Sequence, residues 1–168
     1  MNPRLDLLKP YPFERLRALL AGVAPPAGLA PVNLSIGEPR HPIPDFVAPI
    51  LAAHTAEFGQ YPPNEGTPGL LAAICGWLRL RYGVDLAPDR VMVLNGTREG
   101  LFDACLALCP EVKRGRQPVV LMPNPFYQVY AASALAVGAE PVFVPADAAN
   151  GFLPDYAALP PDILDRVG

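Results

Sequence analysis

The stretches VMVLNGTREGLFDACLALC (residues 91–109) and VVLMPNPFYQVYAASALAVGAEPVFV (residues 119–144) alternate between strand and helix patterns. Short apolar runs predict strands and longer runs with helical spacing predict helices, in the order 91–94, 97–109, 119–122, 126–137 and 141–144. On the first helix, the side chains expected to face the core are Leu101, Phe102, Cys105 and Leu106. This order predicts an α/β fold with a mostly parallel sheet flanked by helices, whose strand-to-helix loops share the edge where ligands bind.

Outside that stretch the sequence predicts mostly short helices. The best-marked helix has Thr67 as N-cap and Pro68 in its first position, and it ends at Gly83. Shorter helices are expected at 13–20, 46–54 and 155–159. Because three parallel strands leave two open edges, we expect an incomplete domain. We divide the chain into an N-terminal arm with helices, residues 1–84, and the first part of the α/β domain, residues 85–168.

The composition is that of a globular chain. Hydrophobic residues make up 51% of the 168 residues and charged residues 17%, which argues against disorder. The net charge of −3 argues against nucleic acid or an anionic membrane as partner. The longest apolar stretch, residues 18–31, is interrupted by prolines and glycines, whereas a membrane span needs about 20 apolar residues.

The cysteines and the N-terminus bear on compartment and metals. An odd number of cysteines in apolar helical patterns, Cys75, Cys105 and Cys109, favours reduced, buried thiols. A signal peptide does not fit because Asp6, Glu14 and early prolines interrupt it, so the cytoplasm is expected. With two histidines and no second cysteine pair, we predict no metal site.

Two strand-to-helix loops are the candidate ligand site. In the first, Gly96 allows a tight turn, and the N–H groups of Thr97 and Arg98 open a helix, which suits an anion. The second loop places Phe126, Tyr127 and other aromatic rings beside it. Together they suit a flat phosphorylated cofactor. The alternatives are an ordinary capped helix for the first loop and core aromatics for the second.

Four sequence blocks occur together in this order: LSIGEP (34–39), YPPNEGTP (61–68), NGTREG (95–100) and PNPFY (123–127). In this combination the chain resembles the class I/II aminotransferases, which are fold-type I enzymes dependent on pyridoxal 5'-phosphate. The opening residues MNP (1–3) and LLKPYPFERL (7–16) resemble more narrowly the bacterial N-succinyldiaminopimelate aminotransferases of lysine biosynthesis. The resemblance covers essentially the whole chain.

The resemblance implies roles for individual residues. The backbone of Gly96, Thr97 and Arg98 would bind the cofactor phosphate, and Tyr127 would stack on the pyridine ring. Tyr61 would reach the phosphate of the neighbouring subunit's cofactor in a homodimer, and residues 1–84 would contribute to the small domain and the dimer interface.

On the substrate side, the resemblance implies that Gly37 lies against the substrate carboxylate, where a side chain would collide. The alternatives are a turn glycine for Gly37 and a core or loop aromatic for Tyr61. The implied reaction transfers an amino group between an amino acid, N-succinyl-LL-2,6-diaminopimelate, and 2-oxoglutarate.

Transamination also needs a lysine that binds the cofactor as a Schiff base. The lysines of the chain are Lys9 and Lys113, and neither matches the family's position, which lies beyond the chain end. We therefore assign no catalytic residue and expect an inactive N-terminal portion. Two alternatives stay open: another fold-type I enzyme such as a carbon–sulfur lyase, and a non-catalytic module that keeps only the phosphate loop.

Overall fold

A computed structural model describes residues 2–168. The chain forms two compact units: one comprises the N-terminal residues through Pro10 together with Leu94–Gly168, and the other comprises Tyr11–Val93. The domain boundary expected between residues 84 and 85 stays a prediction.

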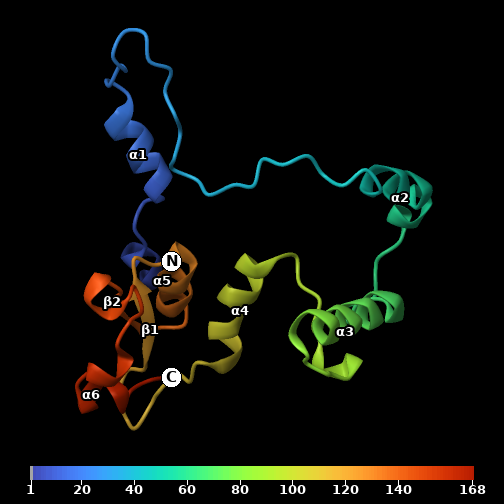
Figure 1. The fold of residues 1–168 in the computed structure, drawn as a ribbon. Coiled ribbons are helices and arrows are strands. Elements are labelled where there is room, and N and C mark those ends of the chain that lie inside the picture. The colour runs from blue at the N-terminus through green and yellow to red at the C-terminus, as the bar shows by residue number, and fades with distance from the viewer. Residues whose placement is uncertain (1) are drawn as a thin grey trace. The chain divides into compact units, whose positions relative to one another are not determined.

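The first unit is a small α/β layer built on a parallel strand pair, β1 and β2 (Figure 1). These strands pair in the register Val119↔Glu140 to Asn124↔Pro145, and α5 connects them. The α/β class with a parallel sheet is thus confirmed. In chain order the elements of this unit are η1 (Pro3–Leu7), α4 (Thr97–Leu108), β1 (Val119–Asn124), α5 (Gln128–Ala136), β2 (Glu140–Pro145), η4 (Ala148–Asn150), η5 (Tyr156–Ala158) and α6 (Pro161–Leu164).

The core of this unit lies between β1 and α5. Met122 is 1% exposed and packs against Ala134 and Ala139, whose small side chains let the helix approach the strand closely. Buried Ser133 donates a hydrogen bond to the Tyr130 carbonyl at 3.0 Å, so its hydroxyl is satisfied inside the helix. A small, closely packed apolar core therefore stabilises this unit.

The strand expected at 91–94 does not form, and this part of the prediction is wrong. Val91 is extended (φ −118°, ψ 131°), but the segment pairs with no strand among residues 2–168. A strand needs a neighbour that takes up its N–H and C=O groups. On its second edge, β1 instead meets Val167: Val119 donates to the Arg166 carbonyl at 2.8 Å, and Gly168 donates back at 3.0 Å.

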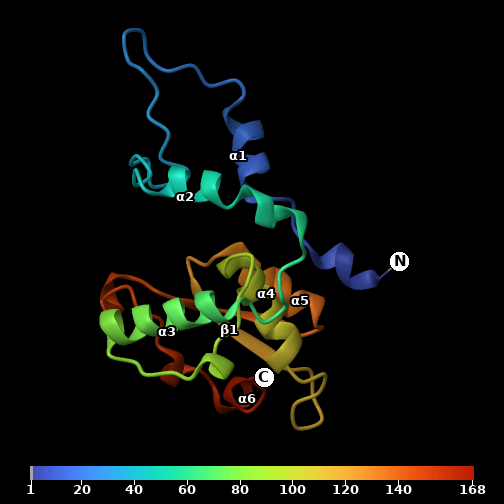
Figure 2. The ribbon, with the colours of Figure 1, turned by 90° about the vertical axis from the view of Figure 1, so that its right-hand side faces the viewer.

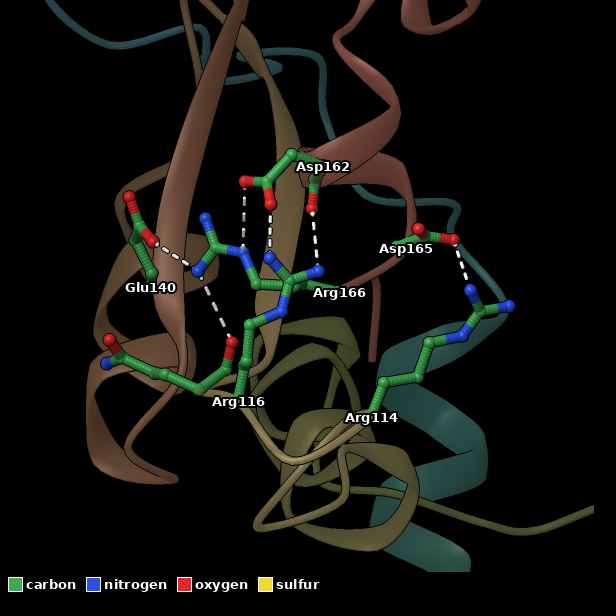
Figure 3. Close-up of polar contacts among 7 residues, drawn as sticks. Arg114, Arg116, Glu140, Asp162, Asp165 and Arg166 are labelled. Atoms are coloured by element: carbon green, nitrogen blue, oxygen red, sulfur yellow. Dashed lines mark hydrogen bonds and ion pairs between the residues drawn. The ribbon is translucent and has the colours of Figure 1, made fainter.

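Ion pairs hold the end of the chain against this second edge (Figure 3). Arg114 pairs with Asp165 and Arg116 pairs with Asp162, so two ion pairs join the turn before β1 to α6 and its C-cap residue. Arg166, whose side chain is largely buried, pairs with Glu140 at 2.8 Å.

At the other end of the chain, η1 is attached to the same unit. Arg4 donates to the Ala136 carbonyl at 2.9 Å, which caps the last turn of α5. Gly138 has a φ of +82°, and a Cβ there would lie 2.6 Å from the Arg4 guanidinium.

The second unit consists of helices and irregular chain (Figures 1 and 2). The signals expected for α3 are confirmed: Thr67 accepts a hydrogen bond from the Leu70 N–H, Pro68 opens the helix, and Gly83 ends it in the left-handed conformation at φ +67°. The helices of this unit are α1 (Pro12–Leu20), α2 (Val47–Ala53), η2 (Thr55–Gly59), α3 (Pro68–Tyr82) and η3 (Pro88–Arg90).

Large apolar side chains are exposed in both units. On α4, Leu101 and Leu106 are 38% and 56% exposed, so neither is buried as expected of core residues, whereas Phe102 and Cys105 are half-buried. Exposed apolar surface on this scale is typical of faces that contact further protein. Within residues 2–168, none of the helices has the length and hydropathy needed to cross a bilayer.

Candidate functional site

The segment expected to be the first strand-to-helix loop, which no strand precedes within the described residues, leads into the N-terminus of α4. Gly96 is the N-cap residue with φ +123° and ψ 164°, a conformation that only glycine adopts without strain. A Cβ at Gly96 would meet nothing within 4 Å, so glycine is required by the backbone and not by crowding. Among residues 2–168, no side-chain cap hydrogen bond is made at Gly96, and the N-terminus of a helix is a setting that suits an anion.

Glu99 fixes this loop, a role that the sequence analysis missed. Its carboxylate accepts hydrogen bonds from the Asn95 backbone N–H at 2.6 Å and from the Asn95 amide at 3.3 Å. Glu99 is at the third helical position, like a capping-box glutamate, but it bonds the N–H of Asn95, one residue before the N-cap Gly96. The position of Glu99, three residues after the Gly96 cap, was the available signal. Because the carboxylate is engaged with Asn95, the loop is held ready without a ligand.

Tyr127 lies beside this loop and is joined to it by a side chain. The Nε of Arg98 donates to the Tyr127 hydroxyl at 2.7 Å. The Tyr127 ring also meets the ring of Tyr130 edge-on, with centroids 5.8 Å apart and an interplanar angle of 88°. The two strand-to-helix loops predicted to share a sheet edge are therefore in contact. Only the backbone of Arg98 entered the sequence prediction, and its side-chain contact with Tyr127 is new.

Phe126 makes its ring contact with β2. Its ring packs against Phe143, with centroids 4.7 Å apart, and it directly precedes Tyr127, the N-cap residue of α5. Its expected placement beside the anion site stays a prediction.

Gly37 and Tyr61 belong to the unit Tyr11–Val93. The Tyr61 side chain is fully exposed at 102%, and a Cβ at Gly37 would meet nothing within 4 Å. Their implied roles toward the substrate and toward a neighbouring subunit's phosphate stay predictions.

The two lysines lie outside this site. Lys113 forms a tight turn with Arg116, in which each N–H donates to the other's carbonyl at 2.9 and 3.0 Å. That turn follows the C-terminus of α4, a helix of 12 residues and hence about 18 Å long, whose other end begins at Gly96. Lys9 is exposed between η1 and α1.

Cys75 lies on α3, Cys105 lies on α4, and Cys109 is the C-cap residue of α4. All three are free and half-buried, so the expected reduced state agrees with the structure, whereas full burial does not. Burial raises the pKa of the Cys109 thiol; Cys105 raises it further and Lys113 opposes the shift. A raised thiol pKa keeps the sulfur protonated and unreactive. Within residues 2–168, no three His, Cys, Asp or Glu side chains gather as metal ligands.

An apolar groove of about 290 Å³ lies beside the site. It runs along β1 and is lined by α4 and α5, with Leu101, Val120 and Met122 among its lining residues. Because no charged group lines it, the groove suits apolar contact, whereas the loop at Gly96 suits an anion.

The residues at the loop fit a phosphorylated cofactor with a flat ring. The helix N-terminus after Gly96 suits a phosphate, and the Tyr127 ring beside it offers a flat surface on which another ring can stack.

Known proteins resemble the chain over nearly its full length. The family model for aminotransferase class I and II matches residues 30–167. The LL-diaminopimelate aminotransferase of Moorella thermoacetica is 40% identical over 166 residues, which are 97% of this chain and 41% of that protein. That of Syntrophobacter fumaroxidans is 36% identical over the same shares.

Solved structures of aminotransferases also align with nearly the whole chain. An aminotransferase from Neisseria meningitidis aligns with a TM-score of 0.87 and 36% identity, over 99% of this chain and 42% of that one. The aminotransferase AspB from Helicobacter pylori aligns with a TM-score of 0.82 and 32% identity, over 95% and 41%. The chain thus spans about two fifths of the length of these relatives.

Proposed function

The chain belongs to the class I and II aminotransferases, and from this premise we propose that it forms the cofactor-phosphate site of a pyridoxal 5'-phosphate-dependent transaminase. The observation that carries the proposal is the contact between the two loops. A glycine-capped helix N-terminus and a tyrosine ring are joined by the hydrogen bond from Arg98 to Tyr127 at 2.7 Å. A phosphate and an attached flat ring need this pair of features side by side.

The residues of the chain bind and orient. The N–H groups of Thr97 and Arg98 would bind the phosphate, where the helix dipole favours negative charge. Gly96 provides the turn, and Tyr127 offers its ring as a stacking surface worth about 0.5–1.5 kcal/mol beyond area burial. When bound, pyridoxal phosphate supplies the electron sink for amino-group transfer.

For the substrate, we propose a diaminopimelate amino acid, with 2-oxoglutarate as amino acceptor. The opening sequence blocks favour N-succinyl-LL-2,6-diaminopimelate, whereas the relatives from M. thermoacetica and S. fumaroxidans are named for LL-diaminopimelate. Both substrates belong to lysine biosynthesis, and in both a second amino-acid group lies at the end far from the reacting amine. They differ in whether the distal nitrogen is charged, so a direct comparison of the two discriminates between them.

For assembly, we propose a homodimer in the cytoplasm, in which Tyr61 approaches the neighbouring subunit's phosphate. What supports this is the full exposure of the Tyr61 ring, because a large aromatic side chain in solvent is typical of a contact residue.

The first experiment is a titration of the chain with pyridoxal phosphate, followed by borohydride reduction and intact-mass measurement. We expect reversible binding and no covalent adduct. A stoichiometric adduct on Lys9 or Lys113 would mean that the chain has its own Schiff-base chemistry. Absence of binding would remove the cofactor site.

The second experiment tests activity and substrate. Residues 1–168 are joined to the part of the M. thermoacetica enzyme that follows its aligned region, and amino transfer to 2-oxoglutarate is measured with LL-diaminopimelate and with its N-succinyl form. An active hybrid supports the transaminase. Cleavage of a carbon–sulfur bond in cystathionine, without transfer, would favour the lyase alternative. A folded hybrid that binds cofactor but catalyses neither reaction would favour the non-catalytic module.

A further inference from the structure

We propose that Arg98 is a positioning residue, whose guanidinium holds the Tyr127 ring at the angle needed to stack on a bound ring. This inference rests on the proposed function, but its central observation is independent of any ligand. It concerns the side chain of Arg98, whereas the phosphate would be bound by the backbone N–H of the same residue.

Two contacts join the Arg98 guanidinium to the Tyr127 ring. The Arg98 Nε donates to the Tyr127 hydroxyl at 2.7 Å, and the Cζ lies over the ring at 5.7 Å from its centroid. The hydrogen bond fixes the position of the hydroxyl, and the cation–π contact adds to the attraction between the two side chains.

A second contact completes the restraint. The Tyr130 ring meets Tyr127 at 88° with centroids 5.8 Å apart, and Tyr130 itself packs against the buried Met122 cluster. A tyrosine side chain has two dihedral angles, and the second of them is only broadly restricted by intrinsic preference. The hydrogen bond from Arg98 restrains the Tyr127 hydroxyl, and the contact with Tyr130 restrains the ring. Together the two contacts restrain both side-chain dihedral angles of Tyr127. Since Tyr127 is 37% exposed, packing alone leaves the ring free to turn.

Two roles for the Arg98 side chain make different predictions. A side chain that binds phosphate directly adds to the affinity for any phosphate. A side chain that positions Tyr127 adds only to the affinity for phosphates that carry a ring, and its effect disappears when the Tyr127 hydroxyl is removed. Arg98→Met separates these effects because it removes the charge and the donors but keeps the backbone N–H and a good helix propensity.

The first test needs no ligand. In protein with isotope-labelled tyrosine rings, the signal of Tyr127 is assigned by its loss in Tyr127→Phe. We expect Arg98→Met to shift the ring signals of Tyr127 and Tyr130 while the other four tyrosines stay in place, and Arg98→Lys, which retains a donor, to restore most of the shift. Arg17→Met on α1 is the matched control and should shift neither signal. Unmoved signals in Arg98→Met would overturn the proposal.

The second test is a double-mutant cycle on binding. A hydrogen bond worth about 1 kcal/mol corresponds to about a fivefold change in affinity. We therefore expect Arg98→Met and Tyr127→Phe each to weaken pyridoxal phosphate binding by about that factor, the double variant to weaken it no further, and inorganic phosphate binding to stay unchanged.

The outcomes of this cycle are distinct. If Arg98→Met weakens inorganic phosphate and pyridoxal phosphate equally while Tyr127→Phe weakens neither, Arg98 binds the phosphate directly and the positioning role is refuted. If the unsubstituted chain binds neither ligand, the proposed cofactor site fails, and the ring signals alone still decide whether Arg98 holds Tyr127.

Discussion

The two units of this chain differ in what holds them together. Among residues 2–168, the buried apolar residues Pro118, Val119, Met122, Ala134, Ala139 and Val144 all belong to the unit that contains the Gly96 loop. The unit Tyr11–Val93 has well-marked helices but no buried side chain among its described residues. Caps and helix propensity therefore define its elements, whereas packing defines the other unit. The difference separates local sequence signals from contacts between distant segments.

The largest effect on the free energy of unfolding is expected from truncating a side chain of the packed core. Met122→Ala should destabilise the unit by about 2–5 kcal/mol, because a fully buried methionine leaves a cavity. Met92→Ala, at a side chain 78% exposed, is the matched control and should change stability by less than about 0.5 kcal/mol. Denaturation monitored by hydrogen exchange at β1 and α5 measures both. Equal effects would abolish the distinction between the two units.

A second effect is expected at the loop. Gly96→Val forces a β-branched residue to a φ of +123°, at a cost of about 1–3 kcal/mol that the loop relieves by shifting. We expect pyridoxal phosphate binding to be abolished while the far-ultraviolet circular dichroism changes little. Gly28→Val imposes similar strain at φ +87° in the other unit and should leave binding intact. Unchanged affinity in Gly96→Val would remove the phosphate assignment.

The same division explains what the sequence could predict. The ends of α3 follow from Thr67, Pro68 and Gly83, each of which acts within one helical turn. The strand expected at Val91 fails because its apolar pattern says nothing about which segment pairs with it. The bridge at Val167 was invisible for the same reason, since it joins residues nearly fifty positions apart.

At the candidate site, the backbone features were predictable and the side-chain contacts were not. Gly96 before a helical pattern identifies a loop that suits an anion from the sequence alone. The hydrogen bond from Arg98 to Tyr127 spans 29 positions and depends on how two loops meet at the sheet edge. Residues that match a family block can therefore be named from sequence, but the side chains that orient them need the structure.

A smaller change in stability is expected in the helical unit, Tyr11–Val93, and it tests the same comparison. Gly76 lies inside α3, and a Cβ there would meet nothing within 4 Å. Gly76→Ala should therefore stabilise the helix by about 0.5–1 kcal/mol through backbone entropy alone. Thermal unfolding of α3 by circular dichroism measures the gain. A loss of stability would show that this face of α3 is already packed, and that the helical unit has a core of its own.

The smallest effect concerns the ion pairs that hold α6 at the edge of β1. The hydrogen bond and charge of Arg116 lower the pKa of Asp162 below its ordinary value of 3.8. A carboxyl whose folded pKa is depressed stabilises the fold above its unfolded pKa and loses that contribution as the pH falls through the folded value. Hydrogen-exchange protection at the Val119 N–H, which bonds the Arg166 carbonyl, should thus decline below about pH 4.

Asp162→Asn isolates this contribution, because the amide keeps the shape and loses the charge. It should reduce the protection of the Val119 N–H at neutral pH and flatten its decline in acid, whereas Asp89→Asn on η3 should do neither. Since the Asp162 side chain is 63% exposed, added salt should weaken the effect in the unsubstituted protein. If protection at Val119 is the same in Asp162→Asn and is insensitive to salt, α6 is held by its backbone bridge alone, and the packed unit extends to the end of the chain without help from charge.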